Sequence, residues 1–142
     1  MPKQNTSLTI KNNTSEIARM SLWLTGSLAR HGLSRELQFK FDLCANEAIT
    51  NIIDYGFPLG GEHTITLQLT VNDVNAILII KDDGIAFNPL LNPPHAQPET
   101  LEEAKVGGLG VDLIRHYMDD IDYVRKTNTN ILSMQVNLPE SH

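Results

Sequence analysis

Apolar residues recur along the first half of the chain at two spacings, which predict one strand and two helices. Alternation of apolar and polar residues at positions 8–10 indicates a short first strand. Residues 17–28 have apolar side chains at helical spacing behind helix-capping side chains at 13–16, which predicts the first helix. The same spacing continues over 34–54 and predicts a second, longer helix, which Gly56 is expected to end.

The middle of the chain has the alternation of a sheet, followed by a long irregular segment. Residues 63–71 alternate between apolar and polar, whereas residues 74–81 are more uniformly apolar, as a central strand would be. Residues 88–106 contain four prolines and have little periodicity. Irregular segments of this length inside a compact domain are uncommon and often functional, so we expect an active-site lid here rather than a disordered insertion.

The last part of the chain predicts a third helix over 110–118 and a closing pair of strands. Apolar positions at 121–123 and 131–138 indicate these strands, with the turn placed at 128–130. The element order predicts an α+β two-layer sandwich. Its sheet is expected to be mixed but mostly antiparallel, with three main helices on one face, in a single domain spanning 1–142.

Length and charge exclude several classes of protein. A chain of 142 residues with a formal net charge of −6 forms one domain with a hydrophobic core, and it lacks the basic footprint of a nucleic-acid binder. The single cysteine, Cys44, precludes an internal disulfide, and its place on an apolar helix face indicates a core residue. No apolar run is long enough for a signal peptide or a membrane span, so we expect a cytoplasmic protein with no membrane contact.

Glu47 and Asn51 are the first candidate site residues. They lie four residues apart on the second predicted helix and therefore share one face, beside the apolar stripe. An amide there needs a partner, and its oxygen is a competent Mg²⁺ ligand, while a carboxylate one turn earlier can deprotonate a nucleophile. A solvent-facing pair of the same residues is common on helices, and on this pair alone it is the better interpretation.

Two further segments make a nucleotide site the better interpretation. Asp82 ends an apolar strand, where its carboxylate can accept a hydrogen bond from the exocyclic amine of adenine, and Gly84 lets the backbone approach a flat base. Three glycines within 107–110 open the third predicted helix, where backbone N–H groups can contact phosphates. An Asp-Gly turn or a glycine joint alone is common. Their order and spacing after the Glu47 and Asn51 pair are much more specific.

These segments resemble the motifs of the Bergerat-fold (GHKL) ATPase superfamily. Within it, the chain is similar to the small bacterial anti-sigma-factor serine/threonine kinases. Residues 47–51 resemble the N box, residues 82–89 the G1 box, and residues 107–114 the G2 box with the helix that follows. The resemblance extends from the first strand to Leu138.

The resemblance implies ATP and Mg²⁺ as cofactors, with 88–106 as the ATP lid. Asn51 would be the metal ligand, and Glu47 would be the catalytic carboxylate that polarises a partner's serine hydroxyl for attack on the γ-phosphate. Nucleotide contacts would come from Asn51 and from residues of the G1 and G2 boxes: Asp82, Gly84, Ala86, Lys105, Gly107, Gly108, Leu109 and Gly110.

Small relatives of this kind bind a sigma factor and a STAS-type antagonist, which is the phosphorylation substrate, and they often form homodimers. Two functions therefore stay open. One is a kinase, and the other is a nucleotide-dependent module that sequesters a partner without phosphorylating it. The second depends on Val106, since close relatives commonly have a phosphate-contacting arginine there. A simple ATPase and a histidine kinase are less favoured, because we see neither a transducer domain nor a preceding helix with a phospho-acceptor histidine.

Overall fold

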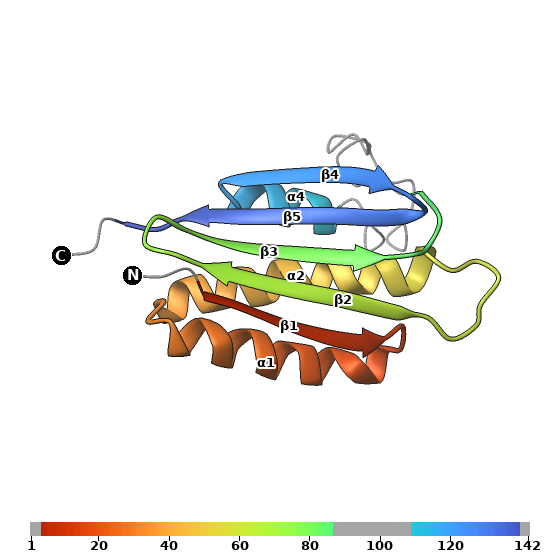
Figure 1. Cartoon of the computed structure of the whole chain (residues 1–142), viewed down its shortest axis with the longest axis horizontal. Helices are drawn as coiled ribbons and strands as arrows, with labels where there is room; N and C mark the ends of the chain where they lie inside the picture. Colours follow the sequence, from red (N-terminus) through yellow and green to blue (C-terminus); the bar gives the residue numbers. More distant parts are fainter. Residues whose placement is uncertain (1–3, 87–108, 140–142) are drawn as a thin grey trace.

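The computed structural model describes residues 4–86 and 109–139 (Figure 1). The described elements, in chain order, are β1 (Gln4–Lys11), a 3₁₀ turn η1 (Thr14–Glu16), α1 (Ile17–Arg30), α2 (Arg35–Tyr55), β2 (Thr64–Val71), β3 (Asn75–Asp82), α4 (Leu109–Tyr117), β4 (Asp120–Lys126) and β5 (Thr129–Asn137).

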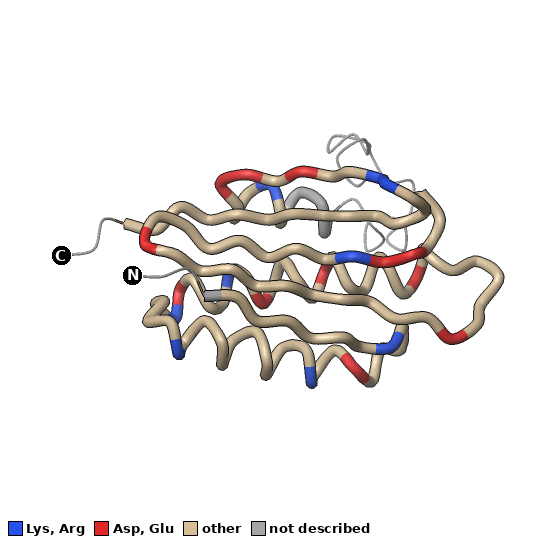
Figure 2. Tube along the Cα trace, in the orientation of Figure 1, with Lys and Arg blue, Asp and Glu red and all other residues tan. Residues whose placement is uncertain are grey.

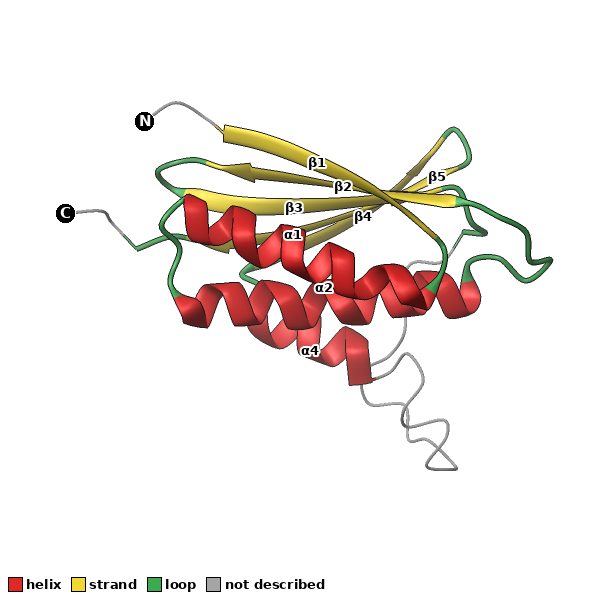
Figure 3. Cartoon of the chain, turned by 90° about the horizontal axis from the view of Figure 1, so that it is seen from below, coloured by secondary structure: helices red, strands yellow, loops and turns green. Residues whose placement is uncertain are grey.

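The strands form one five-stranded sheet in the order β1-β2-β3-β5-β4. Helices α1, α2 and α4 pack on the same face of this sheet (Figure 3). The predicted α+β two-layer arrangement is therefore confirmed. All four ladders between the described strands are antiparallel, whereas the sequence had predicted a mixed, mostly antiparallel sheet.

The core lies between the sheet and the helices. Every second residue of β2 and of β3 is buried, so each strand has one face toward the helices. The buried residues of these two strands are Ile65, Leu67, Leu69, Val71, Ala76, Leu78, Ile80 and Asp82. β3 lies third in the sheet, which confirms its prediction as a central strand.

Helix α2 packs against the core and ends beside the C-terminal end of β3. Its start is fixed by Ser34, whose hydroxyl accepts a hydrogen bond from the Leu37 N–H at 3.2 Å. At its other end the N–H of Gly56 donates to the Ile52 carbonyl at 2.8 Å. The structure thus matches the helix predicted over 34–54 to within one residue at each end.

The β4–β5 turn differs from the prediction. Thr127 and Asn128 both have positive φ, of 51° and 60°, and form the two-residue turn. Turns of this hand match the twist of the flanking strands. The prediction placed the turn at 128–130, which is wrong because Thr129 and Asn130 already belong to β5.

Basic residues are scattered over the described elements and form no stripe along any of them (Figure 2). None of the described helices has the length and apolar character needed to cross a membrane.

Candidate functional site

Three buried polar side chains meet at one cavity. Of the four buried polar residues in the described part of the chain, Asn51, Asp82 and Asn130 line this cavity, at 7%, 6% and 5% exposure. The space between these side chains, counted together with the open solvent at its mouth, amounts to about 370 Å³. Its wall is completed by apolar residues and one tyrosine: Ala48, Ile52, Ile114, Tyr123 and Leu132. An adjoining hollow, which amounts to about 210 Å³ with the open solvent at its mouth included, has the same three polar residues in its wall. Buried polar groups need partners, so their gathering around an open space indicates a ligand site.

The fold explains why these residues meet. Asn51 lies near the end of α2, and Asp82 is the last residue of β3. Asn130 lies directly opposite Asp82 in the β3–β5 ladder. Antiparallel pairing places the two side chains on the same face of the sheet, which is the face that the helices cover.

Asp82 has one carboxylate oxygen engaged and one left open. Its Oδ1 accepts hydrogen bonds from the Gly84 N–H at 2.9 Å and from Asn130 Nδ2 at 3.0 Å. Its Oδ2 accepts none from any described residue, and the residue lines the cavity. Burial raises the pKa of Asp82 above its usual value and nearby Asp83 adds to the rise, whereas both hydrogen bonds and the charge of Arg125 oppose it.

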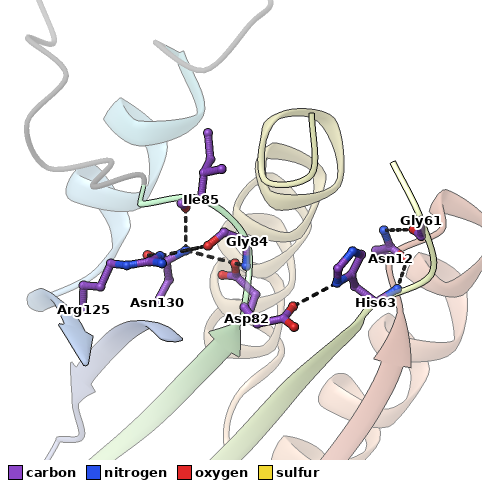
Figure 4. A network of polar contacts seen from close by, with 9 residues as sticks. Asn12, Gly61, His63, Asp82, Gly84, Ile85, Arg125 and Asn130 are labelled. Atoms are coloured by element: carbon purple, nitrogen blue, oxygen red, sulfur yellow. Dashed lines mark hydrogen bonds and ion pairs between the residues drawn. The ribbon is translucent and has the colours of Figure 1, made fainter. Parts of the chain in front are cut away.

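Asn130 is the centre of a hydrogen-bond network that joins β5, β4 and the turn after β3 (Figure 4). Besides Asp82, its Nδ2 donates to the Ile85 carbonyl at 2.8 Å, with a longer contact of 3.4 Å to the Gly84 carbonyl. Its Oδ1 accepts from Arg125 Nη1 at 3.0 Å and from the Tyr123 hydroxyl. The same Arg125 nitrogen donates to the Gly84 carbonyl at 2.8 Å.

Gly84 packs so closely that no other residue fits without a shift. A Cβ added there would lie 2.6 Å from the Gly56 carbonyl oxygen and 2.9 Å from Asp82 Oδ1. The next residue, Ile85, donates its N–H to the same Gly56 carbonyl at 2.9 Å. The turn after β3 is therefore docked on the end of α2, which leaves its backbone close to the cavity wall.

Asn51 is buried, yet its amide makes no hydrogen bond with any described residue, although it lines both cavities. No buried side-chain nitrogen or oxygen in the described part of the chain lacks a hydrogen-bond partner, so the polar atoms of this amide are open to the cavity, where a polar ligand or a metal ion can contact them. No cluster of three His, Cys, Asp or Glu side chains suited to a metal occurs in the described part of the chain. A metal at Asn51 would therefore need most of its ligands from elsewhere, as a nucleotide's phosphates provide.

The remaining predicted site residues lie at three kinds of position. Glu47 is half-buried on α2, one turn before Asn51, and is not among the residues that line the cavities. Ala86 is exposed after the β3 turn, and Leu109 and Gly110 begin α4. The lid segment 88–106, with Lys105, and the two glycines Gly107 and Gly108 lie outside the described residues.

Cys44 packs in the core, as its place on the apolar helix face predicted. Burial, together with the charge of Glu47, raises the pKa of its thiol to about 12, so the thiol stays protonated and unreactive at physiological pH.

The sequence interpretation missed Asn130, Arg125 and Tyr123. Asn130 follows Asn128 and Thr129 and was assigned to the turn, where such residues are common. The missed signal was register: a two-residue turn at 127–128 places Asn130 opposite Arg125 of β4 and opposite Asp82 of β3.

Comparison with known proteins agrees with this geometry. The family model described as histidine kinase-like ATPase domain matches residues 10–136. The serine/threonine-protein kinase BtrW of Bordetella bronchiseptica is 36% identical over 114 residues, which cover 79% of each chain. The serine-protein kinase RsbW of Listeria monocytogenes is 29% identical over 104 residues, covering 70% of this chain and 66% of its own.

Two further similarities are more distant. The anti-sigma F factor of Bacillus licheniformis is 29% identical over 76 residues, or 54% of this chain and 52% of its own. Among solved structures, the histidine kinase domain of a blue-light activated histidine kinase from Erythrobacter litoralis superposes with a TM-score of 0.55. It covers 87% of this chain and 59% of its own at 13% identity, which shows a shared fold alone.

Proposed function

The chain belongs to the histidine kinase-like ATPase family, and we propose that it is an ATP-dependent protein serine/threonine kinase of the anti-sigma type. The observation that carries the proposal is the cavity at which Asn51, Asp82 and Asn130 meet. Two of these side chains keep unused hydrogen-bonding capacity toward the cavity: the Asn51 amide and Asp82 Oδ2.

Asp82 is proposed to recognise the adenine base. Its open Oδ2 is an acceptor for the exocyclic amine of adenine, and Gly84, in the turn docked on Gly56, is proposed to line the base. The apolar wall formed by Ala48, Ile52 and Leu132 suits the faces of an aromatic ring.

Asn51 is proposed to hold Mg²⁺ that is bound together with ATP. Its amide lines the cavity and makes no hydrogen bond with a described residue, which fits this role, since an amide oxygen is a hard ligand of the kind Mg²⁺ prefers. The ion, when bound, would neutralise phosphate charge. Leu109 and Gly110 begin α4, and their backbone N–H groups are proposed to contact phosphate oxygens.

Glu47 is proposed as the catalytic carboxylate. It takes the proton of a partner's serine hydroxyl as the serine oxygen forms a bond to the γ-phosphorus of ATP. The bond from that phosphorus to the β–γ bridging oxygen breaks, its electron pair stays with the departing ADP, and the products are phosphoserine and ADP. The position of Glu47 on α2, one turn before Asn51, places it on the helix that lines the cavity.

The partners are proposed from the relatives' names. Because relatives are named serine-protein kinase and anti-sigma F factor, we propose a sigma factor as one partner and a STAS-type antagonist as the phosphorylated one. A homodimer, a cytoplasmic location and a single domain over 1–142 with a lid at 88–106 complete the proposal.

A partner-sequestering module without kinase activity is the second candidate. The observation that favours it is Val106 in place of the arginine that close relatives commonly have before the glycine cluster. This module would bind ATP and a partner but would form no phosphorylated product.

Phosphate transfer from γ-labelled ATP to candidate STAS-fold proteins separates the two functions. We expect labelled serine with the wild type and at least about a hundredfold slower transfer with Glu47→Gln, while ATP affinity changes by less than about threefold. Glu36→Gln is the matched control, since Glu36 is an exposed residue of the same helix. Undiminished transfer by Glu47→Gln would exclude Glu47 as the base, and ATP-dependent partner binding without label would favour the module.

A further inference from the structure

The orientation of the Asn130 amide is fixed by its neighbours. Both of its N–H groups and both lone pairs of its oxygen are engaged, with Arg125 and Tyr123 donating to Oδ1. A half-turn of the amide would bring its oxygen against the Asp82 carboxylate and the Ile85 carbonyl, and its NH₂ group against the guanidinium. Arg125 and Tyr123 thereby hold the Asn130 NH₂ group toward Asp82.

This orientation has a consequence for the Asp82 carboxylate. With Asn130 Nδ2 and the Gly84 N–H both donating to Oδ1, this oxygen is engaged and Oδ2 is left toward the cavity. Donors to a carboxylate favour its ionised form, which opposes the effect of burial. An ionised Oδ2 accepts hydrogen bonds only, whereas a protonated one would also donate.

We propose that Asn130, held by Arg125 and Tyr123, is a positioning residue that makes the site select adenine over guanine. The inference rests on the proposed function, in which Asp82 contacts the base. Adenine presents an amine to Oδ2, whereas guanine presents a carbonyl oxygen at the same ring position. An ionised Asp82 attracts the first and repels the second, and a protonated Asp82 loses this discrimination.

The charged groups around Asp82 come from the adjoining residue of the chain and from β4. Asp83 follows it in the chain and pairs with His63 at 3.3 Å, and Arg125 approaches from β4 with the Tyr123 hydroxyl beside it. Helices α2 and α4 contribute uncharged groups to the cavity wall: Ala48, Asn51, Ile52 and Ile114. Arg125 is therefore the cation beside the Asp82 carboxylate, and removing Arg125 tests the inference.

The test measures ATP and GTP affinity by calorimetry at pH 8 and pH 6. Arg125→Met removes one holder of the amide, and Lys126→Met removes a charge from the next residue of the same strand as the matched control. We expect the wild type and Lys126→Met to share one ATP preference. Arg125→Met should lower the ratio of the two affinities by about tenfold at pH 8 and further at pH 6. Tyr123→Phe, which removes a single hydroxyl, should also lower the ratio of ATP affinity to GTP affinity.

The outcomes separate the inference from the proposed function. A folded wild type that binds neither nucleotide would contradict the proposed function itself. A wild type that binds both equally would overturn the inference while leaving nucleotide binding intact. The inference would also be overturned if variants at Arg125 and Tyr123 lowered the affinities for ATP and for GTP by equal factors at both pH values, because a merely structural role has that effect. If Arg125→Met does not fold, Tyr123→Phe decides alone.

Discussion

Replacing Gly84 by alanine tests how closely the nucleotide-recognition turn is docked on α2. The new methyl group would lie 2.6 Å from the Gly56 carbonyl oxygen and 3.0 Å from its carbon, and both of these atoms belong to backbone. Ordinary contact begins at 3.4 Å, so the turn would move away by about 0.8 Å. Such a shift would also break the 2.9 Å hydrogen bond from the Ile85 N–H to the Gly56 carbonyl.

The expected loss of stability follows from these two effects. Overpacking in a close-packed site costs about 1–3 kcal/mol, and a lost buried hydrogen bond adds about 1 kcal/mol. We therefore expect Gly84→Ala to lower the free energy of unfolding by about 2–4 kcal/mol. The methyl group also lies 2.9 Å from Asp82 Oδ1, so ATP affinity should fall by at least about tenfold.

Urea unfolding and ATP calorimetry measure the two effects, with Gly26→Ala as the control. Gly26 lies within α1, where an added Cβ has its nearest neighbour at 3.6 Å, so alanine there should stabilise the protein by about 0.5–1 kcal/mol. If the free energy of unfolding of Gly84→Ala lies within about 0.5 kcal/mol of the wild-type value and the variant binds ATP equally well, the close docking of this turn on α2 is contradicted.

Three further predictions concern stability. Burial raises the pKa of Asp82 in the folded protein, so its contribution to stability is lost as the pH rises through that raised pKa. Asp82→Asn, which keeps the Oδ1 acceptor, should therefore be more stable than the wild type at pH 8. Below the ordinary pKa of 3.8 this advantage should disappear, and urea unfolding at pH 8 and below that pKa checks both expectations. Leu78→Ala, at a fully buried position of β3, should lower the free energy of unfolding by about 2–5 kcal/mol, whereas Leu59→Ala, at a fully exposed position, should change it by less than about 0.5 kcal/mol. Ser34→Ala removes the cap of α2 and should destabilise the protein by about 1 kcal/mol in thermal unfolding, and an unchanged melting temperature would contradict the capping role.

The sequence predicted the elements well where hydrophobic periodicity was strong. The second helix and the two central strands were placed to within a residue or two, because their apolar positions repeat over at least eight residues. The first strand was predicted too short, at 8–10 instead of Gln4–Lys11, since its residues 4–7 are all polar and give no alternation, although they pair with residues 68–71 of β2.

The site was predictable where its residues lie in one short motif. Asp82 and Gly84 were identified from the Asp-Asp-Gly segment, and Asn51 from its spacing to Glu47. Asn130 was missed because its role comes from pairing with a strand 48 residues away. A one-residue error in the turn hides such pairing, since it moves every side chain of the strand to the other face.

Titration of ATP into the wild type and Asn51→Ala, with Mg²⁺ and with EDTA, tests the central claim that this cavity is a metal-dependent nucleotide site. Thr50→Ala, at the neighbouring helix position that does not line the cavities, is the control. The account predicts that Asn51→Ala folds at least as stably as the wild type, since the amide has no described partner to lose. It also predicts that this variant loses at least about tenfold in affinity with Mg²⁺ and little with EDTA. Equal Mg²⁺-dependent binding by the wild type and Asn51→Ala, or no ATP binding by the folded wild type, would contradict it.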